Sequence, residues 1–129
     1  MPSLLATITA ACDPAKPTLG ERPLLDPGQA TELAGLFKIL ANDSRLRLLH
    51  ALARAGEPCV SELAAAVAMT PQAVSNQLQR LVDRRIVAAR RAGNNVHYRI
   101  VDPCVASLLE VGLCLTEATQ PPPPSGLGR

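Results

Sequence analysis

The chain has 129 residues, the size of one ordinary domain, and 47% of them are hydrophobic. Only 2% are aromatic, so we expect a core of aliphatic side chains packed between helices. No segment approaches the roughly 18 apolar residues of a membrane span, and the start lacks the basic region of a secretory signal. These features exclude a transmembrane or secreted protein and predict a cytoplasmic one, although the net charge of +2 alone identifies no partner.

Two proline-rich segments enclose the expected domain. Residues 1–25 contain several prolines and keep no amphipathic period, so we predict a flexible N-terminal arm there. Residues 119–129 include a run of prolines and are predicted to form a Pro-rich disordered tail. The folded domain is therefore expected over residues 26–118.

Helical periodicity predicts three helices in the first half of this domain. Asp26-Pro27 starts the first, Asn42-Asp43-Ser44 starts the second and Gly56 ends it, and the third begins at Ser61. The predicted apolar stripes are Leu33, Leu36, Phe37 and Leu40, then Leu46, Leu49 and Ala53, then Leu63, Ala64 and Val67.

A fourth helix is predicted from Thr70-Pro71 to about Arg84. Its inward stripe is Val74, Leu78, Leu81 and Val82, and its other face is polar. A short helix, a tight connector and a polar-faced helix are typical of a helix-turn-helix unit, whose second helix enters the major groove of DNA. Amide and hydroxyl side chains can bond to base edges. The candidate DNA-binding residues of this helix are Gln72, Ser75, Asn76, Gln77 and Arg80.

The pattern then changes to the alternation of a β-hairpin, with strands at 86–91 and 96–100 around a turn at 92–95. Between Thr70 and Ile100, six arginines oppose one aspartate, a balance of +5, whereas the rest of the chain carries 7 basic and 10 acidic residues, or −3. Such a basic wing can contact the DNA backbone or a minor groove. Its candidate contacts are Arg90, Arg91, Asn94 and Asn95, whereas His97 and Tyr98 are expected to pack the wing.

Asp102-Pro103 starts a last helix that is apolar on nearly all sides. A helix of this kind needs neighbours on both sides, and the simplest second neighbour is another copy of the chain. We therefore expect a mainly α fold with a small β-hairpin wing. This is a winged helix-turn-helix that dimerises through its terminal helices and binds duplex DNA.

Three segments resemble ArsR/SmtB-type metal-responsive repressors. They are LFKILANDSRLRLL at 36–49, TPQAVSNQL at 70–78 and VHYRI at 96–100, and the resemblance spans roughly residues 30–117. It implies a homodimer that represses a promoter, on an operator that is an inverted repeat. It also implies that the operator is released when a metal ion or another thiol-reactive effector binds.

The resemblance places effector sites at the third helix and at the last helix. At the third helix, Cys59 is present but Ser61 stands where a second thiolate is expected, and Cys12 of the arm could contribute. At the last helix, Asp102 and Cys104 match ligand positions. Leu115 and Ala118 stand where relatives carry a histidine and an acid, with Cys114 and Glu117 one residue away.

Cys104 and Cys114 lie roughly 15 Å apart along one helix, so they cannot share an ion within one chain. A mixed sulfur and oxygen site is therefore expected between subunits, from Asp102 and Cys104 with the partner's Cys114 and Glu117. Such a site suits cadmium, lead or zinc, and an arsenite-like ion that prefers three thiolates could add Cys59. No C-x-x-C motif is present, and all four cysteines are expected to be thiols.

Other interpretations of the sequence stay open. The same cysteines could serve a thiol-redox or persulfide switch on the same fold, or could be structural small hydrophobes. A metal-binding interaction module without DNA is the other alternative, and the clustered arginines speak against it. The chain contains no Gly-rich phosphate loop, G-x-S-x-G or H-E-x-x-H motif, so we expect neither an enzyme nor an organic cofactor.

Overall fold

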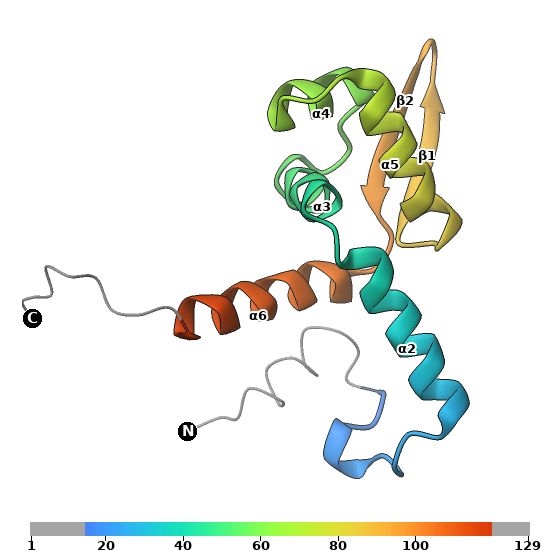
Figure 1. The fold of residues 1–129 in the computed structure, drawn as a ribbon. Helices are drawn as coiled ribbons and strands as arrows, with labels where there is room; N and C mark the ends of the chain where they lie inside the picture. Colours follow the sequence, from blue (N-terminus) through green and yellow to red (C-terminus); the bar gives the residue numbers. More distant parts are fainter. Residues whose placement is uncertain (1–14, 120–129) are drawn as a thin grey trace, which may run out of the picture.

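A computed structural model describes the backbone of residues 15–119 and the side chains of residues 15–118. The predicted tail after Thr119 and the first 14 residues of the predicted arm lie outside the described residues. The described elements are a 3-10 turn at Leu19–Glu21, α2 (Pro27–Leu40), α3 (Asp43–Ala55), α4 (Val60–Val67), α5 (Pro71–Asp83), β1 (Val87–Ala92), β2 (Asn95–Ile100) and α6 (Pro103–Thr119). Figure 1 shows α3, α4, α5 and the hairpin gathered into one body, from which α2 and α6 project.

Side-chain caps start the helices where the sequence predicts them. Asp26 Oδ1 accepts a hydrogen bond from Gln29 N at 2.8 Å, and the Gln29 side chain accepts one from Asp26 N. The Asn42 side chain caps α3 by accepting from Arg45 N at 3.0 Å. Thr70 Oγ1 accepts from Ala73 N at 3.1 Å, with proline at the first helical position of α5. Local chemistry therefore fixes the start of α5, the helix that the sequence predicts to contact DNA.

The core lies where α3, α4 and α5 meet the base of the hairpin. Its buried residues are Leu40, Leu48, Leu49, Leu52, Leu63, Ala64, Val67, Val74, Leu78, Leu81, Ile86 and Val87. The predicted stripe of α4 is confirmed, and so is that of α5 except at Val82, which is only half-buried against the core. The predicted stripe of α3 is wrong at Leu46, which is 39% exposed, and at Ala53, which is exposed. Because α3 packs against α4, α5, β2 and α6, its buried side is Leu48, Leu49 and Leu52 instead.

The wing is a two-stranded antiparallel hairpin with a shorter turn than predicted. Ala92 pairs with Asn95, so only Gly93 and Asn94 form the turn and the predicted turn of four residues is wrong. Gly93 has φ +64, as expected for glycine at the first central position of a two-residue hairpin turn. The two outer residues of the predicted turn therefore belong to the strands.

An apolar groove of about 690 Å³ lies between α2, α3 and α6. Phe37 and Leu46 line one side of it, and Leu109, Leu113 and Leu115 line the other. Phe37 is 48% exposed and Leu115 is 65% exposed, so one chain alone leaves this surface uncovered. Among residues 15–119, no helix is long and apolar enough to cross a membrane.

Candidate DNA interface and effector site

The outer face of α5 carries most of the predicted base-contacting side chains. The buried stripe Val74, Leu78 and Leu81 turns the opposite side of the helix to solvent. Gln72, Asn76 and Arg80 are exposed, and Ser75 is half-buried. Gln72 Nε2 donates to Asn76 Oδ1 at 3.2 Å, one turn away. This face combines amide donors, amide acceptors and a guanidinium, which suits hydrogen bonding to base edges.

Gln77 lies apart from this exposed face. It is half-buried, and its Oε1 atom accepts a hydrogen bond from Arg45 Nη1 at 2.8 Å. The same guanidinium donates through Nε to the carbonyl of Ile39, near the end of α2, at 2.6 Å. Gln77 therefore contacts α3 through Arg45, a residue that no sequence motif indicated.

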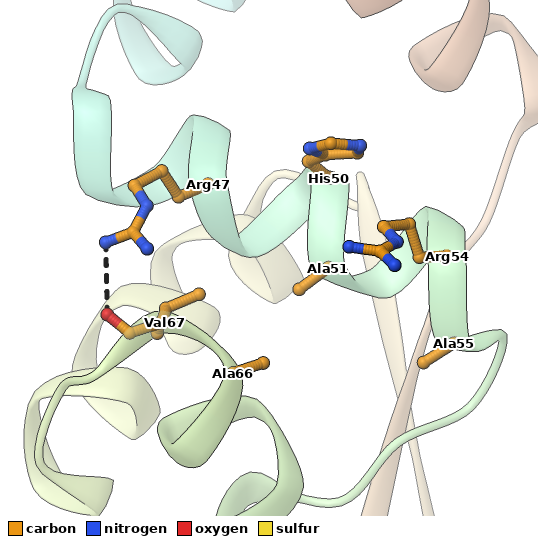
Figure 2. A pocket seen from close by; sticks show the side chains of 7 residues that line it. All are labelled: Arg47, His50, Ala51, Arg54, Ala55, Ala66 and Val67. Atoms are coloured by element: carbon orange, nitrogen blue, oxygen red, sulfur yellow. Dashed lines mark hydrogen bonds between the residues drawn. The ribbon is translucent and has the colours of Figure 1, made fainter.

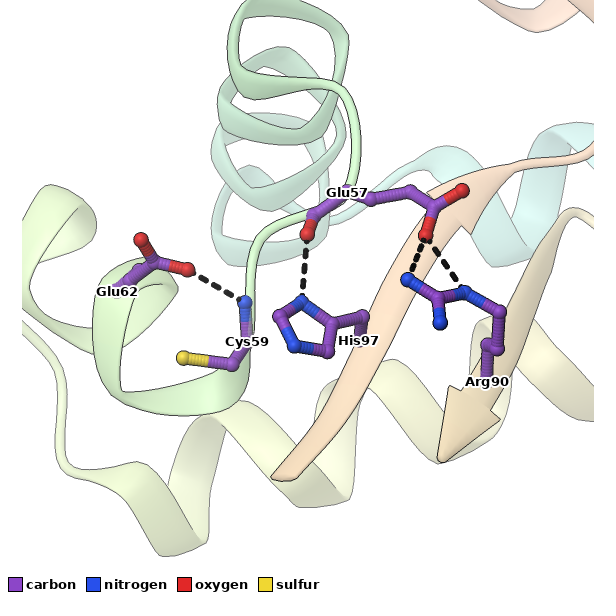
Figure 3. Close-up of polar contacts among 5 residues, drawn as sticks. All are labelled: Glu57, Cys59, Glu62, Arg90 and His97. Atoms are coloured by element: carbon purple, nitrogen blue, oxygen red, sulfur yellow. Dashed lines mark hydrogen bonds and ion pairs between the residues drawn. The ribbon is translucent and has the colours of Figure 1, made fainter. Parts of the chain in front are cut away.

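The predicted wing contacts are exposed on β1, β2 and the turn between them. Arg91, Asn94 and Asn95 are exposed. Arg90 is exposed too, but its Nε and Nη2 atoms both donate to Glu57 Oε1, at 2.9 and 2.7 Å (Figure 3). This contact lowers the pKa of Glu57 below its ordinary value of 4.5. In the structure Arg90 thus already holds a carboxylate, whereas Arg91 is in no ion pair with a described residue.

The connector between α3 and α4 is bonded to the wing. Tyr98 N donates to the Pro58 carbonyl at 3.0 Å, and His97 Nδ1 lies 2.8 Å from the Glu57 carbonyl. The backbones of Cys59 and His97 pair through a single antiparallel β-bridge, and Figure 3 shows the imidazole of His97 between the connector and β2. His97 and Tyr98 therefore fix the base of the wing on the helix-turn-helix unit, the packing role that the sequence predicts.

Cys59 is a free thiol at the N-terminus of α4. Its Sγ lies 3.1 Å from Ser61 Oγ, and Glu62 Oε1 accepts from its backbone N–H at 2.9 Å. The hydrogen bond from this N–H lowers the pKa of Glu62. Cys59 is the only thiol at this end of α4 among the described residues, because Ser61 stands two residues later and Cys12 lies outside them.

The predicted α6 ligands are spread along the helix. Asp102 Oδ1 accepts from Cys104 N at 2.8 Å at the start of α6. Cys114 is an exposed free thiol near the other end, and Glu117 is exposed. Within the described part of one chain, no three His, Cys, Asp or Glu side chains gather closely enough to hold a metal ion. One copy of α6 therefore does not assemble the predicted ligand set.

Cys104 departs from the expectation that every cysteine is a thiol, because it is disulfide-bonded in the structure. Neither Cys59 nor Cys114 is its partner, since both are free. A sulfur in a disulfide cannot bind a metal as a thiolate. Cys104 could therefore act as a metal ligand only after reduction.

Together, the buried α5 stripe, its polar outer face and the basic hairpin define a winged helix-turn-helix DNA-binding protein. Comparison with known proteins identifies the family. The family model for "Bacterial regulatory protein, arsR family" matches residues 42–89, from α3 to the start of β1. Relatives of 30% identity or more, matched over more than two thirds of their length, show that the chain belongs to this family and is a DNA-binding transcriptional repressor.

Individual relatives agree with this assignment. The transcriptional repressor SmtB homolog of Synechocystis sp. is 49% identical over 80 residues, which cover 62% of this chain and 60% of that protein. The crystal structure of the AntR antimony-specific transcriptional repressor is 66% identical with a TM-score of 0.71, covering 81% of this chain and 94% of that one. A homodimeric winged helix-turn-helix DNA-binding domain from Mycobacterium bovis is 32% identical with a TM-score of 0.65, covering 78% and 94%.

Proposed function

We propose that this chain acts as a homodimeric, cytoplasmic repressor that leaves its operator when a thiophilic metal or metalloid ion binds between the two α6 helices. The observation that carries this proposal is the position of Cys104 and Cys114 on a helix whose apolar surface is left uncovered by one chain. No enzymatic activity is part of the proposal.

The exposed apolar groove supports the proposal that two copies of the chain form a homodimer. Leu113 and Leu115 on α6 are more than half exposed, and Phe37 on α2 is nearly so. Covering this surface with a second copy removes it from water, which is the main driving force of such association. The homodimeric relative from Mycobacterium bovis has the same fold.

An ion site that bridges two subunits fits the chemistry of the α6 side chains. Cys104 and Cys114 supply soft sulfur ligands, and Asp102 and Glu117 supply oxygen ligands. An antiparallel arrangement of two α6 helices would bring Cys104 close to Cys114 of the partner subunit. A thiolate pair favours thiophilic ions such as cadmium, lead or arsenite, and the similar AntR protein is an antimony-specific repressor. A third thiolate for a trivalent metalloid would be Cys59.

Release of DNA then follows from a change in population between two dimer geometries. An ion bound across the subunit contact favours the geometry in which the two α5 helices no longer match successive major grooves. A coupling of roughly 1–3 kcal/mol is enough to weaken DNA binding about 5- to 150-fold.

The experiment is a binding titration of the reduced protein on a labelled fragment from upstream of its own gene, where we expect an inverted repeat. We expect tight binding to this fragment and release by at least one ion in a panel of zinc, cadmium, lead, nickel, arsenite and antimonite. A protein that stays bound to the fragment under every ion in the panel would contradict the proposed effector class.

The disulfide at Cys104 favours a second candidate, a repressor that responds to thiol oxidation. In this case oxidation, without any ion, changes the position of α6 and releases DNA. Two measurements on the same fragment separate the two candidates: the fully reduced protein with and without added ion, and the oxidised protein in the presence of a chelator. Ion-dependent release of the reduced protein supports the first candidate, and release on oxidation alone supports the second.

A further inference from the structure

A hollow of about 490 Å³ opens between α3 and α4, on a face that contains none of the predicted DNA contacts. Figure 2 shows Arg47, His50 and Arg54 in a row along α3 at its rim. These positions are three and four residues apart, so they share one face of the helix. The rest of the lining is small, from Ala51, Ala55, Ala66 and Val67.

The charge of this hollow is positive and is not balanced by neighbouring side chains. In the part of the chain that the structure describes, the only ion pair within 4.0 Å is between Arg90 and Glu57. The only acidic residue of α3 is Asp43, whose carboxylate accepts from Ser44 N at 2.7 Å. Two guanidinium groups and an imidazole therefore face the same open space without a described carboxylate, which suits an anion.

The position of Arg47 connects this hollow to the helix-turn-helix unit. Its Nη1 atom donates to the Val67 carbonyl at 3.0 Å, which holds the guanidinium against the end of α4 (Figure 2). Ala68, with φ +55, and Met69 form the turn that follows, and α5 begins at Pro71. The row of Arg47, His50 and Arg54 thus begins beside the turn that leads into α5, the helix predicted to enter the DNA groove.

We propose that the α3 face formed by Arg47, His50 and Arg54 binds backbone phosphates of the operator, so that the DNA interface continues from α5 across the turn onto α3. This inference rests on the DNA-binding role of the family and concerns affinity, not base recognition. The alanine side chains of the lining keep the hollow open enough for a phosphate to reach the guanidinium groups.

The test uses Arg54→Gln, because Arg54 is exposed and forms no ion pair with a described residue, so the variant should fold normally. The matched control is Lys38→Gln, which removes the same charge from an exposed position of α2 outside the hollow. Affinity is measured against salt concentration for the operator fragment and for a scrambled duplex, with thermal unfolding as a check on folding.

We expect Arg54→Gln to lower the slope of log affinity against log salt by about 1 for each phosphate that a chain no longer neutralises. The affinity should fall equally on operator and scrambled DNA, because phosphate binding carries no sequence information. Arg54→Lys should restore most of the slope, and Lys38→Gln should leave it unchanged.

Two results would overturn the inference. One is an equal slope for wild type, Arg54→Gln and Lys38→Gln, which would mean that no phosphate is bound at the α3 face. The other is an unchanged slope together with Arg54-dependent binding of inorganic pyrophosphate without DNA, which would make the hollow a site for a small anion. Release by the effector ion is not involved, so failure here leaves the proposed function untouched.

Discussion

Arg45 Nη1 donates to Gln77 Oε1 at 2.8 Å, and this hydrogen bond joins α3 to the middle of α5 across 32 residues of sequence. The Nε atom of the same side chain donates to the Ile39 carbonyl near the end of α2. Since Phe37 and Leu40 of α2 line the apolar groove, one guanidinium connects the groove to α5, the helix predicted to contact DNA.

Removing this link should lower operator affinity without removing a base contact. A hydrogen bond to a charged group contributes about 1.5–3 kcal/mol, so we expect Gln77→Ala to weaken operator binding by about tenfold or more. Arg45→Ala should have a similar effect, and the double variant should bind no more weakly than the weaker single variant. The measurement is a double-mutant cycle on operator affinity.

The control for this cycle is Gln79→Ala, a residue of the same helix whose amide donates to Asp83. It should change operator affinity little. If Gln77→Ala still weakens binding in the Arg45→Ala background, Gln77 contacts DNA directly and the positioning role is wrong.

Glu57 should compete with DNA for Arg90, a predicted DNA contact of the wing. Both hydrogen bonds to Glu57 must break before the guanidinium can bind a phosphate through the same atoms. An exposed ion pair is weak because water screens it, so Glu57→Gln should raise affinity for any duplex by no more than about fivefold. Filter binding on operator and scrambled DNA measures this effect.

Glu62→Gln is the matched control, because Glu62 accepts from the Cys59 backbone N–H and is not paired with Arg90. It should leave DNA affinity unchanged. An equal gain in DNA affinity for the two variants would show a general charge effect. It would mean that Glu57 does not compete with DNA for Arg90.

The Glu57–Arg90 pair should also be visible in the pH dependence. Arg90 lowers the folded-state pKa of Glu57 below 4.5, so the pair is present above pH 4.5 and disappears as pH falls through the lowered folded value. Carboxyl carbon NMR should give Glu57 a midpoint below 4.5, and Arg90→Ala should move this midpoint upward. A midpoint that is the same in both proteins would mean that the pair does not form in solution.

Dimerisation should depend on the exposed end of α6. Leu113→Glu places a charge in the apolar groove, where it would be buried without a partner in the dimer. We expect this variant to sediment as a monomer at concentrations where the wild type is a dimer. Ala118→Glu adds the same charge to an exposed position of α6 outside the groove and should remain dimeric. A dimeric Leu113→Glu protein would place the interface elsewhere.

Local chemistry makes much of the fold predictable. The caps at Asp26, Asn42 and Thr70 act within three residues of sequence, so the starts of α2, α3 and α5 follow from the sequence alone. The buried stripe of α5 is equally predictable from the sequence, because this helix has only one buried side. The family resemblance rests on the same segments and is confirmed.

The remaining features depend on neighbours that are distant in sequence. Periodicity assigns Leu46 to the core, but in one chain Leu46 lines the uncovered apolar groove beside Phe37, and no local pattern distinguishes such a surface from the core. The contact between Gln77 and Arg45 spans 32 residues, and that between Arg90 and Glu57 spans 33, so no local pattern indicates either. The oxidised state of Cys104 has no signal in cysteine spacing.

The most direct test of the account uses mixed dimers of Cys104→Ser and Cys114→Ser chains, reduced and loaded with antimonite. A dimer contains two equivalent sites, each built from Cys104 of one subunit and the partner's Cys114. Each parent homodimer lacks one cysteine in both sites, whereas a mixed dimer keeps one site intact. We predict two ions per wild-type dimer, one per mixed dimer and none bound tightly by either parent, with ion-induced release of operator DNA only where a site remains. A mixed dimer that binds no more antimonite than its parents would contradict an effector site built from the α6 cysteines of two subunits.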